Sequence, residues 1–250
     1  MIAGLDVGSR SMELVVLGAD GEVALSRRLP TTFHPLRQIA VILEGVEPQR
    51  LVATGYGREL VVRAGRKMPV KTVTEIRAHA AGAHWAYPQA RTVLDIGGQD
   101  TKAIRLGPDG RVVKFEMNDR CAAGTGKFLE HLAGVFQMPV EEFGDYALGG
   151  GQALPINSMC TVFAETEATS LMAGGARPED IALGLHASIA GRTANMLRRV
   201  GLTPPVVFVG GVAHNPCLLR LLRETLGTDL LVPEAPDMNG AFGAALCARD

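Results

Sequence analysis

One short pattern occurs twice in the chain, and this repeat restricts the fold more than any other feature. Leu94-Asp95-Ile96-Gly97-Gly98 matches Leu5-Asp6-Val7-Gly8-Ser9, and each is an apolar run that ends in Asp and turn residues. The matches continue without a gap and pair Leu106-Gly107 with Leu17-Gly18, Asp109-Gly110 with Asp20-Gly21, and Val112 with Val23. A match of this length indicates an internal duplication.

Each copy has the residue pattern of a β-β-β-α-β-α unit. Apolar runs bounded by turn residues predict strands, and an apolar spacing of three and four predicts helices. In the first copy these are strands over 2–7, 12–17, 23–29 and 51–55, with helices over 35–45 and 75–85. The strand 206–211 of the second copy parallels 51–55.

A duplicated unit of this kind gives two similar lobes with a cleft between them. We therefore predict an α/β fold in which residues 1–88 form a first lobe, completed by the C-terminal helix 238–250. Residues 89–237 form the second lobe.

The two Asp-containing turns favour a nucleotide site. Glycine in a tight hairpin lets backbone amides approach phosphate oxygens closely, and an adjacent carboxylate suits a hydrated Mg²⁺. Asp6 and Asp95 are the candidate carboxylates, and Gln99 and Asp100 are candidates for orienting Mg²⁺ or the attacking water. The alternative is a pair of structural hairpins whose Asp caps a turn. Two turns in the same register, together with Gly210-Gly211 after a buried strand, favour the nucleotide.

Two cysteines each lie in a polar or small-residue stretch before a helical pattern. Cys121 precedes Thr125, a predicted N-cap, and Cys160 precedes a helix that runs to residue 171. A [4Fe–4S] cluster needs four thiolates, which two chains on a two-fold axis would supply. The alternative is that both are incidental cysteines in turns. Cys217 and Cys247 have apolar neighbours and are expected to be buried rather than to bind metal.

Composition excludes several classes of protein. The net charge of the 250 residues is -1, which gives no bulk attraction to nucleic acid. There is no run of 18 apolar residues that would predict a membrane span, and the N-terminus has no signal-peptide layout. The four Cys lack the paired spacing of a disulfide framework. We expect a cytoplasmic protein, and an oxygen-poor setting if the cluster forms.

The motifs resemble the actin/Hsp70/sugar-kinase superfold, which has ribonuclease H-like lobes, rather than a P-loop protein, because no complete Walker sequence occurs. Within that superfold, the chain resembles the ATP-dependent activators (component A) of 2-hydroxyacyl-CoA dehydratases. The ATPase subunits of benzoyl-CoA reductase and the reductases of double-cubane cluster proteins are close relatives. The segments that carry the resemblance are LDIGGQDTK (94–102), MNDRCAAGTG (117–126), CTVFAE (160–165) and GGVAHN (210–215).

This resemblance implies an ATP-hydrolysing homodimer that holds one [4Fe–4S] cluster through Cys121 and Cys160 of each subunit. It implies transfer of one low-potential electron to a partner iron–sulfur dehydratase or reductase, with ferredoxin or flavodoxin as donor. The resemblance also implies that ATP or ADP binds to three loops. The two hairpin loops would contact the phosphates through Gly8, Ser9, Arg10 and Ser11 and through Gly97, Gly98 and Gln99. The third loop, with Gly210, Gly211 and Asn215, would lie by the adenosine.

The first phosphate loop departs from the family pattern at two positions. Many relatives have small or hydroxyl residues followed by Lys, whereas this chain has Arg10 and then Glu13 at the Lys position. A small-molecule kinase of the same superfold, with structural cysteines, is the alternative function. A third is a nucleotide-dependent filament protein. No Asp suited to activating a substrate hydroxyl stands out between the hairpins, which disfavours the kinase.

Overall fold

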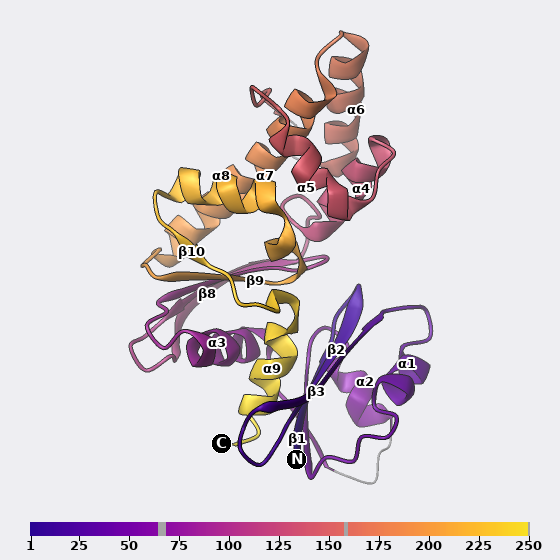
Figure 1. The fold of residues 1–250 in the computed structure, drawn as a ribbon, viewed down its shortest axis with the longest axis vertical. Helices are drawn as coiled ribbons and strands as arrows, with labels where there is room; N and C mark the ends of the chain where they lie inside the picture. The colour runs from indigo at the N-terminus through magenta and orange to yellow at the C-terminus, as the bar shows by residue number, and fades with distance from the viewer. Residues whose placement is uncertain (65–68, 158–159, 250) are drawn as a thin grey trace.

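The computed structural model describes residues 1–64, 69–157 and 160–249, which form two five-stranded sheets with helices on both faces (Figure 1). Ser158 and Met159 of the second cysteine motif lie outside the described residues, as does Asp250 of the predicted C-terminal helix. The strand orders are β3-β2-β1-β4-β5 and, read in the same sense, β8-β7-β6-β9-β10. The two sheets therefore have the same topology, as the repeat predicts.

The first half contains the elements up to residue 86. These are β1 (Ile2–Val7), β2 (Ser11–Leu17), β3 (Val23–Pro30), α1 (Pro35–Ile42), β4 (Arg50–Thr54), α2 (Arg58–Arg63), β5 (Val70–Thr72) and α3 (Glu75–Ala86).

The second half contains the remainder. Its elements are β6 (Thr92–Ile96), β7 (Thr101–Leu106), β8 (Val112–Asn118), α4 (Gly126–Val135), α5 (Val140–Leu148), α6 (Thr161–Ala173), α7 (Pro178–Val200), β9 (Val206–Val209), η1 (Gly211–His214), α8 (Pro216–Leu226), β10 (Leu230–Leu231), η2 (Pro236–Met238) and α9 (Asn239–Leu246).

Strand pairing repeats residue by residue between the halves. β1 pairs antiparallel with β2 and parallel with β4, and β6 pairs in the same way with β7 and β9. The third strand of each half pairs through a register shift at the same point, after Val16 in one and after Arg105 in the other. Most predicted strands and helices lie within one or two residues of their expected bounds. The exceptions are α1, which ends at Ile42, and the strand predicted over 206–211, which ends at Val209 and is followed by η1. The C-terminal helix predicted over 238–250 also ends early, at Leu246.

Helices α3 and α9 lie between the two sheets and contact each other closely. α9 packs on β1, β2 and β4 of the first half, and α3 packs on β6, β7, β8 and β9 of the second. Glycine permits this approach, because a Cβ on Gly243 would lie only 1.8 Å from the Ala78 carbonyl oxygen. Each half thus covers the other half's sheet with its last helix.

The second half is larger because four helices, α4 to α7, stand between β8 and β9 where the first half has α1 alone. Helices α4, α5 and α6 lie at the far end of the molecule from α9 (Figure 1). They pack with α7, α8 and the second sheet into the largest hydrophobic core, which contains Phe128, Phe143 and Phe208. Among the described residues, no helix is both long enough and apolar enough to cross a membrane.

Candidate active site

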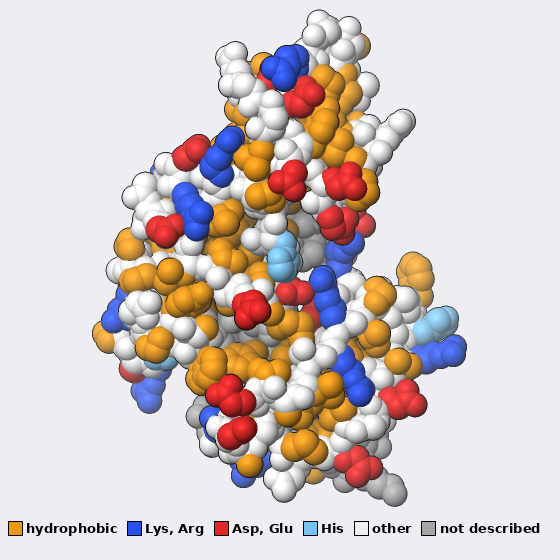
Figure 2. All heavy atoms as spheres, in the orientation of Figure 1, with side chains coloured by type: hydrophobic (Ala, Val, Ile, Leu, Met, Phe, Trp, Pro, Cys, Tyr) orange, Lys and Arg blue, Asp and Glu red, His pale blue; other side chains and the backbone are white. Residues whose placement is uncertain are grey.

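A cavity of about 510 Å³ lies between the two halves, a size suited to a small ligand. Acidic and basic side chains gather along the notch that opens onto it (Figure 2). Every residue predicted for nucleotide or Mg²⁺ lines this cavity, namely Asp6, Gly8, Ser9, Arg10, Ser11, Asp95, Gly97, Gly98, Gln99, Asp100, Gly210, Gly211 and Asn215. The structure therefore brings together residues from three separate stretches of the chain.

Asp6 and Asp95 occupy equivalent places in the two halves. Each lies near the end of a central strand, beside a neighbouring parallel strand that is followed by glycine. Gly55 (φ +89) and Gly210 (φ +87) adopt the left-handed conformation there, and a Cβ on either would lie 2.3 or 2.4 Å from the nearest aspartate Oδ1. Only glycine fits this turn, so both carboxylates are held against a backbone loop at the cavity wall.

The surroundings of Asp95 are cationic. Lys102, directly opposite on β7 and only 2% exposed, places its Nζ 3.0 Å from Asp95 Oδ2 and 2.7 Å from both Asp100 Oδ2 and Glu75 Oε2. His79 Nε2 of α3 lies 3.4 Å from Asp95 Oδ2. Three carboxylates and one buried ammonium thus form a compact cluster.

These contacts set the pKa values of the cluster. Burial alone would raise the pKa of Asp95, but His79 and Lys102 outweigh it and the pKa is lowered. Burial likewise opposes the charge of Lys102, yet Asp95, Glu75 and Asp100 raise its pKa well above the ordinary value. Burial, together with repulsion from Asp95 and Glu75, raises the pKa of Asp100 despite Lys102. Asp95 is therefore ionised and already paired at neutral pH.

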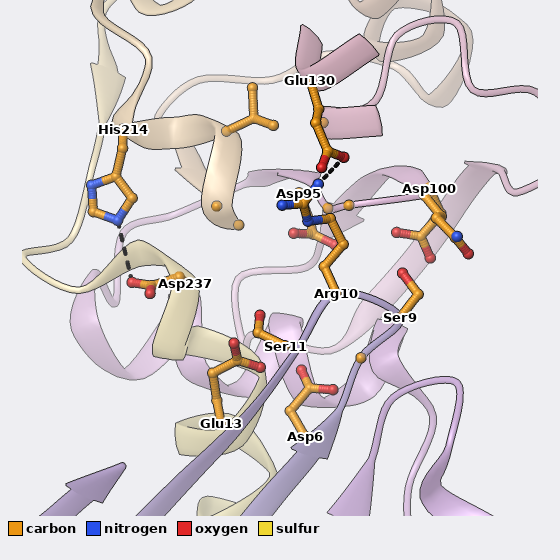
Figure 3. A pocket seen from close by; sticks show the side chains of 18 of the residues that line it. Asp6, Ser9, Arg10, Ser11, Glu13, Asp95, Asp100, Glu130, His214 and Asp237 are labelled. Atoms are coloured by element: carbon orange, nitrogen blue, oxygen red, sulfur yellow. Dashed lines mark hydrogen bonds and ion pairs between the residues drawn. The ribbon is translucent and has the colours of Figure 1, made fainter. Parts of the chain in front are cut away.

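The surroundings of Asp6 are anionic instead. Glu13 stands at the strand position that Lys102 has in the second half. Asp6 is 8% exposed, and no hydrogen bond or ion pair joins its carboxylate to another described residue. Burial, followed by the charges of Glu13 and Glu75, raises the pKa of Asp6 well above the ordinary value. In Figure 3, Asp6 and Glu13 both point from their strands into the cavity.

Glu13 begins a line of charges across the cavity whose other members the sequence analysis did not single out. Arg28 Nε lies 3.3 Å from Glu13 Oε1, and Arg28 Nη1 lies 3.0 Å from Asp237 Oδ2. His214 Nε2 then lies 3.3 Å from Asp237 Oδ1. Burial raises the pKa of Glu13 to about 7, even though hydrogen bonding to Ser11 and the charge of Arg28 act against the shift. The strand period places Glu13 opposite Asp6, but nothing in the sequence indicates Arg28 or Asp237.

Arg10 extends from the first hairpin to the second half of the molecule. Its guanidinium forms an ion pair with Glu130 of α4, shown dashed in Figure 3. Its alkyl chain lies over the second hairpin, where a Cβ on Gly98 would be only 2.6 Å from Arg10 Cγ. Arg10 thus spans the cavity mouth between both hairpins and the cysteine-bearing part of the second half.

Helix α4 is attached directly to the second hairpin. The amides of Gly126 and Lys127 donate to the carbonyl oxygens of Gly97 and Gly98 at 2.9 and 2.8 Å. Thr125 is the N-cap, as predicted, but its hydroxyl donates to the Ala122 carbonyl rather than capping an amide. The carbonyls of the second hairpin therefore satisfy helix amides that would otherwise be free.

The two candidate ligand cysteines lie away from the cavity, at the start of neighbouring helices. Cys160 is the N-cap of α6, and Cys121 precedes α4 by a short turn whose carbonyls accept from Asn118. α4 contacts α6, and His131 Nε2 lies 2.6 Å from Glu165 Oε2 between them. Both thiols are exposed, whereas Cys217 and Cys247 are buried, as expected from their apolar neighbours.

Among the described residues, no group of three or more His, Cys, Asp or Glu side chains is arranged to hold a metal ion.

Comparison with known proteins gives a consistent assignment. A profile of the BadF/BadG/BcrA/BcrD ATPase family matches residues 3–248. The activator of lactoyl-CoA dehydratase from Anaerotignum propionicum is 41% identical over 99% of this chain and 96% of its own length.

Solved structures agree with the sequence comparison. The activator of the 2-hydroxyisocaproyl-CoA dehydratase from Clostridium difficile, with bound ADPNP, is 36% identical and superposes with a TM-score of 0.89 over 99% of this chain and 93% of its own. Component A of the (R)-2-hydroxyglutaryl-CoA dehydratase of Acidaminococcus fermentans is 35% identical, with a TM-score of 0.90 over 98% and 96%. A ROK family glucokinase from Streptomyces griseus, 14% identical with a TM-score of 0.61, shares the actin-like fold alone.

Proposed function

Because the chain belongs to the BadF/BadG/BcrA/BcrD ATPase family, we propose that it is an ATP-hydrolysing activator of a 2-hydroxyacyl-CoA dehydratase or a related iron–sulfur reductase. It would pass one low-potential electron to that partner, after receiving it from a ferredoxin or flavodoxin. The relatives that support this activity are similar along essentially their whole length.

The observation that carries the proposal is the attachment of α4 to the second hairpin. The Gly97 and Gly98 carbonyls accept from the first amides of α4, and Thr101 Oγ1 donates to the Gly124 carbonyl at 2.7 Å. A shift of this hairpin on nucleotide binding or hydrolysis must therefore move the N-terminus of the helix that follows Cys121. A kinase of the same fold has no need for such a connection to a pair of exposed thiols.

The exposed thiols suit a [4Fe–4S] cluster shared by two chains. Cys121 and Cys160 supply half of the four thiolates such a cluster needs, and two exposed apolar side chains, Val162 (62%) and Phe163 (66%), follow Cys160. A second copy on a two-fold axis would supply the other half and cover this apolar surface. When bound, the cluster would supply the one-electron redox chemistry.

The chain's own residues divide the work of hydrolysis. Asp6 lies at the cavity without a hydrogen bond or ion pair to another described residue, and it is positioned to hold water molecules of a Mg²⁺–nucleotide complex. Lys102 and His79 already hold Asp95, which we assign to fixing the second hairpin beside the phosphates. Gln99 and Asp100 stand on that hairpin and would orient the attacking water.

A movement of the two halves relative to each other would link the nucleotide to the cysteines. We propose that residues 1–88 with 238–250 and residues 89–237 act as lobes that close on the nucleotide, with α3 and α9 at their junction. ATP can alter the cysteine site only if the ATP and ADP states favour different lobe positions. Hydrogen bonds from hairpin to α4, and the His131–Glu165 contact from α4 to α6, would carry that difference to both cysteines. We place the protein in the cytoplasm.

The test is anaerobic purification followed by iron, sulfide and mass analysis. A dimer with four iron and four sulfide per two chains is expected. Cys121→Ser and Cys160→Ser should lose iron, and Cys217→Ser, which removes a buried thiol, is the matched control that keeps it. Full iron content in Cys121→Ser would refute the ligand assignment.

The same preparation separates the alternatives. ATP should change the rate at which a ferrous chelator removes iron relative to ADP, and equal rates with nucleotide bound would refute the coupling. An iron-free monomer that phosphorylates a small molecule would support a kinase. ATP-dependent sedimentation into polymers would support a filament protein.

A further inference from the structure

The ion pair between Arg10 and Glu130 joins the two halves at the mouth of the nucleotide cavity. Arg10 belongs to the loop between β1 and β2, and Glu130 to the second turn of α4. Their side chains are 42% and 35% exposed, so solvent partly screens the pair. The pair matters because it links the two halves, not because it is strong.

A phosphate bound between the hairpins would compete with Glu130 for Arg10. Both Arg10 and Glu130 line the cavity, and the Arg10 alkyl chain rests on Gly98 of the second phosphate loop. A guanidinium binds phosphate oxygens in a two-pronged arrangement and is favoured for that reason at phosphate sites. One guanidinium at this place therefore faces two anionic partners, one fixed in the protein and one brought by the ligand.

Glu130 can lose Arg10 without being left as an isolated charge. Lys127, one turn earlier on the same helix, places its Nζ 3.2 Å from Glu130 Oε2. This pair lies entirely within α4, so it can persist whatever the position of the first half. The backbone amide of Lys127 also donates to the Gly98 carbonyl, which keeps it beside the second phosphate loop.

We propose that Arg10 is a phosphate-sensing residue that leaves Glu130 for the phosphates of the bound nucleotide and so releases α4 from the first half. Without nucleotide, the Arg10–Glu130 pair ties the first hairpin to the helix that follows Cys121. With nucleotide, that tie is exchanged for a phosphate contact, and α4 stays attached to the second hairpin alone. This inference rests on the proposed function and assigns a residue pair to its coupling step.

A double-mutant cycle on nucleotide affinity tests the exchange. Glu130→Gln removes the competing charge, so the dissociation constant of a Mg²⁺–nonhydrolysable ATP analogue should fall roughly two- to five-fold, as for other partly exposed pairs. Arg10→Gln should weaken binding. In the Arg10→Gln background, Glu130→Gln should have no further effect, because there is no arginine left to free.

Glu141→Gln is the matched control. Glu141 lines the same cavity from the first turn of α5 and forms no ion pair with Arg10. Removing its charge should change affinity by the same factor in the wild-type and Arg10→Gln backgrounds. Equal tightening by Glu130→Gln in both backgrounds would show a general charge effect and overturn the exchange.

Amide hydrogen exchange over residues 130–135 gives a second measurement. In the nucleotide-free wild type these amides should exchange more slowly than with the analogue bound. Nucleotide-free Glu130→Gln should already exchange at the faster rate, and exchange at the slower wild-type rate would overturn the proposal. Failure of the wild type to bind any nucleotide would instead overturn the proposed ATPase function itself.

Discussion

Replacing Glu13 with Gln should stabilise the protein increasingly as the pH rises. Burial raises the pKa of Glu13 from 4.5 to about 7, so the folded state holds a proton more tightly than the unfolded chain does. Ionisation of Glu13 therefore lowers the free energy of unfolding, and this loss develops as the pH rises from 4.5 to about 7. At about 1.4 kcal/mol per pKa unit, the full loss is roughly 3 kcal/mol.

The side chain of Glu13 is only 7% exposed, so solvent screening reduces this figure little. Gln has no charge to bury, and removing Glu13 also removes its repulsion on Asp6, which acts in the same direction. The difference in unfolding free energy between Glu13→Gln and wild type should widen by about 2 kcal/mol from pH 5 to pH 8.

Urea unfolding at pH 5, 6, 7 and 8 would measure this difference. Fluorescence of the single tryptophan, Trp85, is a suitable signal because its ring packs against Phe242 of α9. Glu22→Gln, which removes a carboxylate from the exposed turn before β3, is the control. The opposite outcome is a difference in unfolding free energy between Glu13→Gln and wild type that stays constant or narrows from pH 5 to pH 8. That result would refute the conclusion that the Glu13 carboxylate is buried beside Asp6 at a cost to stability.

Three further predictions test the rest of the site. Lys102→Met should lower the free energy of unfolding by about 3–5 kcal/mol, because it removes the ammonium that pairs with buried carboxylates. In the same urea assay, the double variant with Asp95→Asn should regain part of this stability. Asp6→Asn should lower the rate of ATP hydrolysis about 100-fold. It should not lower stability, because the Asp6 carboxylate has no ion-pair partner to lose among the described residues. A loss of stability together with a normal rate of phosphate release would contradict this prediction. Gly240→Ala should also lower hydrolysis, because its Cβ would lie 2.0 Å from Asp6 Oδ2, whereas Gly191→Ala, with nothing within 4 Å, should not.

The duplication made most of the fold predictable from the sequence. Matching strand patterns in the two halves predict matching sheets, and the structure has the same strand order in both. The short strands β5 and β10 were not assigned, because two or three residues show no alternation. The sequence patterns also do not predict the helices α2, α5, α7 and α8, whose places follow from packing against the second core or the first sheet rather than from a local motif.

The predicted nucleotide-binding residues all line the cavity, but their electrostatic surroundings could not be predicted from the sequence. Asp6 and Asp95 have the same local pattern, so the sequence treats them as equivalent. They differ because Lys102 and His79 surround one and Glu13 the other, and His79 comes from the opposite half of the chain. Arg10 was expected to meet phosphate, but its pairing with Glu130 depends on how the two halves close on each other.

The exchange of α3 and α9 between the halves has a consequence for how such a chain can be divided and how it arose. A fragment ending at Ala86 would keep its sheet but lose α9, and the remaining fragment would lose α3. Each fragment would expose the strand face that the missing helix covers. Two copies of one half, however, could each lend the final helix to the other's sheet. A fusion of two such copies would keep this exchange of helices, which is the arrangement found between the halves of the present chain.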